Sequence, residues 1–207
     1  MPEEREIKLP VGADFVLPDL DGVVDGTRAV DRGTVELSAT YWDTDDFALM
    51  RATLGLRHRS APGEAGKWTL KAGASMVGDA VSRDETDFPG PSVRPPQAAI
   101  DVIRAVVGDV ELHPVAQLVT DRHTVDLVAG DSRRAEVADD RVSIRSGARI
   151  VETFREVEVE LLDADEQLIG AVMARLRRAG VGEPDSTPKY VRALMALGHA
   201  VPGRTPS

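Results

Sequence analysis

Acidic and basic side chains recur at every second position in several short segments of the chain. Glu156, Glu158 and Glu160 alternate with apolar residues, and Arg57 and Arg59 flank a single histidine. Side chains two residues apart on a β-strand point to the same face, so each set forms a patch of one sign. Carboxylates of this kind bind divalent cations, and guanidinium groups make paired hydrogen bonds to phosphate oxygens. The spacing therefore indicates a site for a polyanion together with a metal ion.

Other segments show the same alternation of charged and apolar positions. Ile7 and Leu9 oppose the charges of the first segment, and Trp68 and Leu70 oppose those of a later one. The charged positions in these segments are Glu4, Glu6, Lys8, Lys67, Lys71, Arg83, Glu85, Asp87, Glu136 and Asp140. For any single segment, a strand with one face in water explains the pattern.

Clusters of one sign on separate strands need a further explanation. A barrel with a polar interior and an outer face covered by helices supplies it, because basic strands then face acidic ones across a lumen. The opposite parity places Trp42, Trp68, His58 and His123 on the outside, where the tryptophans pack against helices and the histidines are not metal ligands. Asp139 is also expected to point outward.

The elements that carry these residues are short strands separated by turn-forming residues. Strands are predicted at 3–9, 34–42, 54–60, 67–72, 82–88, 116–128, 132–139, 142–147 and 153–162. So many consecutive antiparallel strands favour a sandwich or a barrel.

Three helices interrupt the strand pattern. They are predicted at 96–108, at 165–179 with Asp163 as its cap, and after Thr187 as cap with Pro188 at the first helical position. The Pro- and Gly-containing segment 10–32 is interpreted as an irregular excursion and a candidate lid, and 200–207 as a disordered tail.

Composition narrows the function classes. The 207 residues suit one domain, and the absence of cysteine excludes disulfides and thiolate metal sites. A formal net charge of −10 argues against general nucleic-acid binding, which depends on excess Lys and Arg. The charged N-terminus and the lack of a long apolar stretch predict a cytoplasmic protein with no membrane partner.

Several segments of the sequence resemble the motifs of a known family. The run EREIKL resembles the ExExK signature of the CYTH superfamily, the triphosphate tunnel metalloenzymes. Further segments resemble the family's other motifs in the same order, namely ATYWDTDDFALMRATLGLRHR, GKWTLKAG, LVTDRHTVDL, FREVEVELL and STPKYVRAL. The resemblance covers roughly residues 3 to 192.

This resemblance implies an α+β fold, in which helices pack outside a closed eight-stranded antiparallel β-barrel, the triphosphate tunnel, within one domain spanning 1–199. The phosphate-binding positions that it implies, with Arg83 added on parity, are Lys8, Arg57, Arg59, Lys71, Arg83, Arg122 and Lys189. The metal-binding positions, including Glu85, Glu136 and Asp140 on parity, are Glu4, Glu6, Glu85, Glu136, Asp140, Glu156 and Glu158.

The implied cofactor is Mg²⁺ or Mn²⁺, with one ion between Glu4, Glu6 and the phosphates. A second site near Glu156 and Glu158 is expected to orient the attacking water, which makes Glu158 a catalytic candidate. Tyr41 is expected either to assist proton transfer with Lys71 or to pack its ring in the barrel wall.

The implied activity is hydrolysis of inorganic tripolyphosphate. Thiamine triphosphate hydrolysis and class IV-type cyclisation of ATP remain open, as does a non-catalytic polyphosphate-binding module. The expected partner is a small triphosphate or polyphosphate, and the expected assembly is a monomer or homodimer. Three features depart from the family pattern. Asp45 stands where proline is frequent, Thr120 stands where a basic residue is frequent, and the Pro- and Gly-containing segment follows the first strand where many relatives have a helix.

Overall fold

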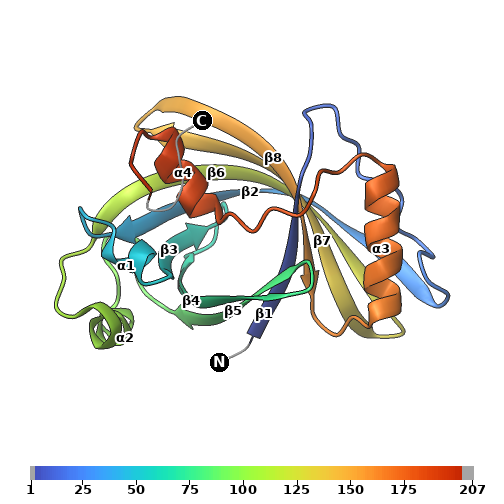
Figure 1. Cartoon of the computed structure of the whole chain (residues 1–207), viewed down its shortest axis with the longest axis horizontal. Helices are drawn as coiled ribbons and strands as arrows, with labels where there is room; N and C mark the ends of the chain where they lie inside the picture. Colours follow the sequence, from blue (N-terminus) through green and yellow to red (C-terminus); the bar gives the residue numbers. More distant parts are fainter. Residues whose placement is uncertain (1–2, 202–207) are drawn as a thin grey trace.

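The core of the molecule is a closed barrel of eight antiparallel strands (Figure 1). A computed structural model describes residues 3–201, and for residues 3, 4 and 77 it describes the backbone alone. The strands are β1 Glu3–Pro10, β2 Thr27–Asp43, β3 Leu54–Ser60, β4 Lys67–Val77, β5 Ala80–Phe88, β6 His113–Ala129, β7 Ser132–Ser146 and β8 Arg149–Leu161. Around the barrel their order is β1-β5-β4-β3-β2-β6-β7-β8, so β1 closes it by pairing with both β5 and β8. The predicted eight-stranded barrel is confirmed.

Strands β2 and β7 differ most from the sequence-based prediction. β2 begins at Thr27 because it pairs with β6 along almost its whole length, so the predicted irregular segment ends before residue 27. The segments predicted as separate strands at 132–139 and 142–147 form one strand, β7, which pairs continuously with β8 past Asp140 and Arg141.

One end of the outer wall is covered by helix α3, Glu166–Arg178. Its buried residues Leu168, Val172, Met173 and Leu176 pack against outward-facing residues such as Val137 and Val159. The irregular segment before β2 joins this cluster through Leu20 and other apolar residues. In the structure that segment is therefore packed on the outer wall with α3.

A second outer cluster lies against helices α1, Ala48–Arg51, and α2, Gln97–Val107. Trp42 and Trp68 meet edge to face in it, with ring centroids 5.5 Å apart, and pack with Ala99 and Ile103 of α2. The prediction that both tryptophans face outward against helices is confirmed.

Helix α4, Lys189–Ala196, packs differently from α2 and α3. Its residues Tyr190, Ala193 and Leu194 contact a buried apolar cluster at one end of the barrel (Figure 1). By strand parity the barrel residues of this cluster face inward, and they are Tyr41, Ala116, Leu118, Val142 and Ile144. The helix thus fills this end of the barrel and brings its first residues to the lumen.

Smaller details also differ from the prediction. The N-cap of α3 is Asp165, whose side chain accepts a hydrogen bond from the Leu168 amide at 2.8 Å, and not Asp163. Val201 is buried beside α4, so the packed chain passes the predicted boundary at 199, and residues 202–207 of the predicted tail lie outside the described residues. Within residues 3–201, no helix has the length and apolar character needed to cross a membrane.

Candidate functional site

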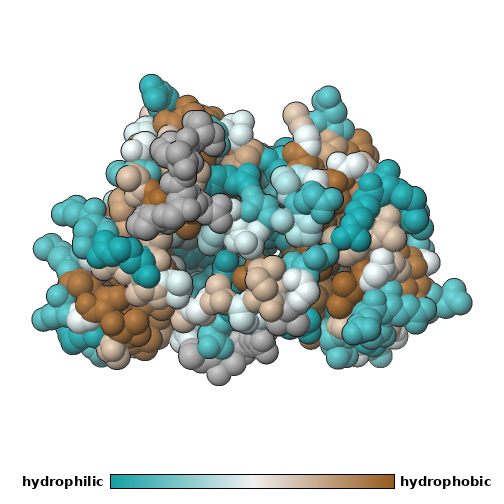
Figure 2. Space-filling view, in the orientation of Figure 1, coloured by the Kyte–Doolittle hydropathy of each residue, from teal (hydrophilic) through white to brown (hydrophobic). Residues whose placement is uncertain are grey.

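The barrel interior contains a cavity of about 380 Å³. Most of the charged side chains that line this cavity are basic. Among the described residues, seven basic and three acidic side chains line it. The basic ones are Lys8, Arg57, Arg59, Lys71, Arg83, Arg122 and Lys189, and the acidic ones are Glu6, Asp140 and Glu158. A chain with a net charge of −10 therefore encloses a cavity with an excess of positive charge. Figure 2 shows hydrophilic atoms gathered in the hollow between the α4 and α3 ends of the molecule.

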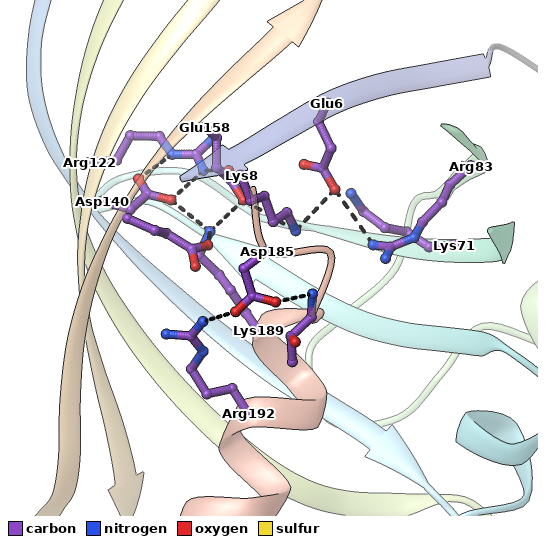
Figure 3. A network of polar contacts seen from close by, with 12 residues as sticks. Glu6, Lys8, Lys71, Arg83, Arg122, Asp140, Glu158, Asp185, Lys189 and Arg192 are labelled. Carbon is purple, nitrogen blue, oxygen red and sulfur yellow. Dashed lines mark hydrogen bonds and ion pairs between the residues drawn. The ribbon is translucent and has the colours of Figure 1, made fainter. Parts of the chain in front are cut away.

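Lys189 joins the acidic strands at the centre of the site (Figure 3). Its ammonium nitrogen lies 2.9 Å from Asp140 Oδ2 and 2.6 Å from both Glu156 Oε1 and Glu158 Oε1. Arg122 donates two hydrogen bonds to Asp140, at 2.8 and 2.6 Å, and one to Glu158 at 2.5 Å. Strands β6, β7 and β8 and helix α4 thus converge on one buried charge network.

The electrostatics of this network favour the charged forms of Lys189 and Glu158. Burial alone would lower the pKa of Lys189, but Asp140, Glu158 and Glu156 outweigh it and raise that pKa well above its ordinary value. Burial would likewise raise the pKa of Glu158, yet Lys189, Lys8 and Arg122 hold it well below its ordinary value. Lys189 and Glu158 are therefore both charged at neutral pH.

The β1 wall continues the network toward β4 and β5. Lys8 Nζ lies 3.0 Å from Glu6 Oε1 and 3.4 Å from Glu158 Oε1, and Arg83 Nη1 lies 3.5 Å from Glu6 Oε1. Lys71 pairs with Glu85 at 2.6 Å on the adjacent strands. The cross-strand register places Lys71 directly opposite Glu85.

On β3, Arg57 and Arg59 form a strongly positive part of the wall. The charge of Arg57, followed by burial, lowers the pKa of Arg59 from 12.5 to about 10. A guanidinium keeps its proton at neutral pH even so. The lowered pKa therefore indicates a region of positive potential, in which a bound anion would offset the repulsion between the two arginines.

Tyr41 and Tyr190 stack at the inner end of this wall. Their ring centroids are 5.1 Å apart, with an angle of 14° between the planes. Burial raises the pKa of Tyr41, but the charge of Arg57 and a hydrogen bond from it outweigh burial and lower that pKa. The hydrogen bond of Tyr41 thus involves Arg57, whereas the expected partner, Lys71, is paired with Glu85.

The segment before α4 positions Lys189 by running alongside β1. The Gly182 amide donates to the Pro10 carbonyl at 2.8 Å, and the Asp185 amide donates to the Lys8 carbonyl at 2.9 Å. A Cβ on Gly182 would lie 2.9 Å from Pro10 Cγ, so glycine permits this close approach. Asp185 also accepts hydrogen bonds from the Thr187 amide and from Arg192 of α4.

Part of the cavity wall is apolar, a feature that the sequence reasoning did not identify. Leu37 and Ala39 of β2 and Leu118 of β6 line it, as does Met50 of α1. Leu37 and Ala39 lie four and two residues before Tyr41 on β2. Strand parity alone could therefore have placed these two residues on the same inward face as Tyr41.

Most predicted site residues meet in this cavity or in the network beside it, and a few do not. Glu156 and Glu85 contact the network through Lys189 and Lys71 without lining the cavity. Glu136 lies at its periphery, 3.2 Å from Arg133 and 4.0 Å from Arg122. The side chain of Glu4 lies outside the described residues.

The outward residues follow the predicted parity. His58 packs edge to face on Trp68, and His123 contacts Asp31 at 2.9 Å. Asp139 pairs with Arg155 through two hydrogen bonds, at 2.8 and 2.6 Å, away from the cavity. Neither histidine lines the cavity.

The acidic residues suit a hard divalent cation by chemistry. The Lys189 ammonium shows that Asp140, Glu156 and Glu158 can direct three oxygens at one cation, and Mg²⁺ and Mn²⁺ prefer oxygen ligands. Among the side chains described, no three acidic or histidine groups are arranged to hold a metal ion, and lysines and arginines contact these acids. The donor atoms fit such an ion, which would have to displace these cations.

Comparison with known proteins places the chain in a family. The CYTH domain model matches residues 2–191. "Uncharacterized protein Rv2226" and "Uncharacterized protein MT2285", from two strains of Mycobacterium tuberculosis, are each 30% identical over 220 residues. The alignment covers 99% of this chain and 42% of each relative, so the chain spans less than half of their length.

Solved structures share the fold. A putative adenylate cyclase from Bacillus halodurans superposes with a TM-score of 0.62 at 17% identity, covering 93% of this chain and 98% of that one. The putative adenylyl cyclase HpAC1 from Hippeastrum, described as having a dominant triphosphatase activity, gives 0.59 at 17% identity, covering 96% and 98%. Since the family model matches nearly the whole chain and these structures share its barrel, the chain belongs to the CYTH domain family.

Proposed function

We propose that this protein is a metal-dependent triphosphatase that hydrolyses inorganic tripolyphosphate or a related triphosphate inside the barrel. The observation that carries the proposal is the enclosed cavity, where seven basic side chains face three acidic ones in an otherwise acidic chain. The triphosphatase activity described for HpAC1, a protein of similar fold, supports the same reaction class.

The basic side chains are suited to bind and orient the phosphates. Phosphoryl transfer needs positioning and charge stabilisation more than covalent chemistry from the protein. Arg57, Arg59 and Arg122 offer planar donor pairs to phosphate oxygens, whereas Lys8, Lys71 and Lys189 act as point charges. Together with Arg83 they surround the cavity from β1, β3, β4, β5, β6 and α4.

The acidic side chains would hold the metal. Mg²⁺ or Mn²⁺ is proposed to bind through Glu4 and Glu6 on β1 and through Asp140, Glu156 and Glu158 on β7 and β8, with Glu85 and Glu136 at the margins. Bound there, a divalent ion would neutralise phosphate charge and lower the pKa of a coordinated water. In this proposal Glu158 would orient the water, and the Tyr41 hydroxyl, which is hydrogen-bonded to Arg57, would lie beside the bound phosphates.

A triphosphate that carries an organic group, such as thiamine triphosphate or ATP, is the second candidate substrate. The apolar part of the cavity wall, made of Leu37, Ala39 and Leu118, favours such a substrate, because inorganic tripolyphosphate has no apolar group to pack against it. Cyclisation of ATP would release pyrophosphate and a cyclic nucleotide, which product analysis separates from hydrolysis.

The test is phosphate release from tripolyphosphate, thiamine triphosphate, ATP and long polyphosphate, each with Mg²⁺ and with Mn²⁺. Lys71→Ala and Glu4→Ala are expected to abolish turnover, because they remove a phosphate contact and a metal ligand. Full activity in both variants would contradict the proposal. Tight calorimetric binding of tripolyphosphate without any release would instead indicate a non-catalytic polyphosphate-binding module. Size measurement in solution would test the expectation of a monomer or homodimer.

A further inference from the structure

Tyr190 connects the start of α4 to a fixed point outside the cavity. It follows Lys189 in the chain, its ring is 5% exposed, and its hydroxyl donates a 2.5 Å hydrogen bond to Asp43 Oδ2. Neither Tyr190 nor Asp43 was identified as a site residue from the sequence, because 147 positions separate them.

Asp43 is well suited to be an anchor. It is fully buried, and its Oδ1 accepts hydrogen bonds from the Thr44 and Leu49 amides, each at 2.8 Å. Its Oδ2 accepts another from the Met50 amide at 3.1 Å. These bonds tie the carboxylate to the end of β2 and to α1, so the oxygen that accepts the Tyr190 hydrogen bond has little freedom to move.

The other face of Tyr190 reaches the basic wall. Its ring stacks on Tyr41, whose hydroxyl is hydrogen-bonded to Arg57. Lys189, one residue away, is in contact with Asp140, Glu156 and Glu158. Tyr190 therefore links the Asp43 anchor to Lys189 through the backbone of α4 and to Arg57 of β3 through Tyr41.

We propose that Tyr190 is a positioning residue, whose hydrogen bond to Asp43 fixes the Lys189 ammonium and, through Tyr41, the Arg57 guanidinium for triphosphate binding. The catalytic consequence rests on the proposed function, whereas the placement of Lys189 does not. A hydroxyl that only filled the core would affect stability and leave both cations in place.

The test compares Tyr190→Phe, which removes only the hydroxyl, with Leu194→Val, a buried change in the same helix that leaves the Asp43 contact intact. The first readout is the ¹³Cε NMR signal of Lys189, which is tractable because the chain has four lysines. The second is kcat/KM for phosphate release from tripolyphosphate. Tyr190→Phe is expected to shift the Lys189 signal and to lower kcat/KM by about tenfold, because small misplacements of binding groups are costly. Leu194→Val is expected to do neither.

A second variant keeps the test decisive if Tyr190→Phe folds poorly. Asp43→Asn is expected to shift the Lys189 signal in the same sense, and the double variant is expected to be no worse than the more damaging single one, because both act through one contact. An unshifted Lys189 signal in Tyr190→Phe, with kcat/KM within about twofold of Leu194→Val, overturns the proposal. If the wild-type protein releases no phosphate, the proposed function fails, and the NMR signal still decides the placement of Lys189.

Discussion

Arg57 and Arg59 place two like charges on one strand face, and their repulsion favours binding of an anion. Each raises the potential at the other, and the lowered pKa of Arg59 records that cost. An anion bound between them removes the repulsion, so part of its binding energy comes from a wall that is electrostatically unfavourable when empty. Replacing either arginine should therefore affect ligand affinity more than folding.

We expect Arg59→Gln to lower kcat/KM for tripolyphosphate by about tenfold or more, mainly through KM, because a charged hydrogen bond to phosphate is lost. Steady-state kinetics measure the effect. Lys67→Gln is the matched control, since Lys67 lies on the neighbouring strand, is half exposed and pairs with Asp87 away from the cavity lining. Equal losses in the two variants would show that general charge, and not the Arg59 position, matters.

The two tyrosines are expected to ionise in a fixed order. Interaction with Arg57 lowers the pKa of Tyr41, whereas burial and the Asp43 hydrogen bond raise that of Tyr190. The contribution of Tyr190 to stability is thus complete below the ordinary pKa, about 10, and is lost as pH rises further. The contribution of Tyr41 has the opposite sign and appears as pH rises through its lowered pKa.

Alkaline titration followed by tyrosinate absorbance checks this order. The first ionisation should belong to Tyr41 and disappear in Tyr41→Phe, and the second, in Tyr190, should accompany unfolding. Loss of the early step in Tyr190→Phe instead would reverse the assignment.

At the scale of elements, α4 contributes both packing and a functional end. Leu194 is fully buried against the inward-facing residues of the barrel. We expect Leu194→Ala to lower the free energy of unfolding by about 2–5 kcal/mol, because it leaves a cavity in a packed cluster. Urea unfolding followed by circular dichroism measures the loss. Val106→Ala on α2, where Val106 is 58% exposed, should change it by less than about 0.5 kcal/mol.

Local patterns in the sequence predicted some elements better than others. Alternation on β1, β3, β4 and β8 placed Lys8, Arg57, Lys71 and Glu158 on the inner face, because side-chain direction on a strand depends only on parity. The first residues of β2 were missed, since Pro and Gly nearby indicate loops and only the pairing with β6 extends the strand to Thr27.

Long-range contacts explain what the sequence could not reveal. The inward packing of α4 has the same amphipathic pattern as a helix on an outer wall, so periodicity alone cannot distinguish the two. The anchoring of Tyr190 on Asp43 joins distant residues by side-chain contact alone. Each depends on closure of the barrel and not on any short motif.

At the scale of the molecule, an acidic protein with a basic interior should gain stability from a polyanion. Ligand that binds only the folded state stabilises it by RT ln(1 + [L]/Kd), about 2.7 kcal/mol at a hundredfold excess over Kd. We expect tripolyphosphate to raise Tm in a concentration-dependent manner, measured by calorimetry. Phosphate at equal ionic strength is the control, because a single phosphate cannot reach all the basic strands. Equal shifts with both anions would contradict a site built for a chain of phosphates.

The tryptophans lie on the outside of the barrel wall, and the tyrosines lie on the inside. Both tryptophans of the chain pack on the outside against α1 and α2, and both tyrosines stack inside beside the cavity. Intrinsic tryptophan fluorescence will therefore report on the outer helices and the integrity of the wall. We therefore expect tryptophan fluorescence to stay constant during a tripolyphosphate titration. Ligand binding then has to be followed through tyrosine fluorescence or through the heat of binding.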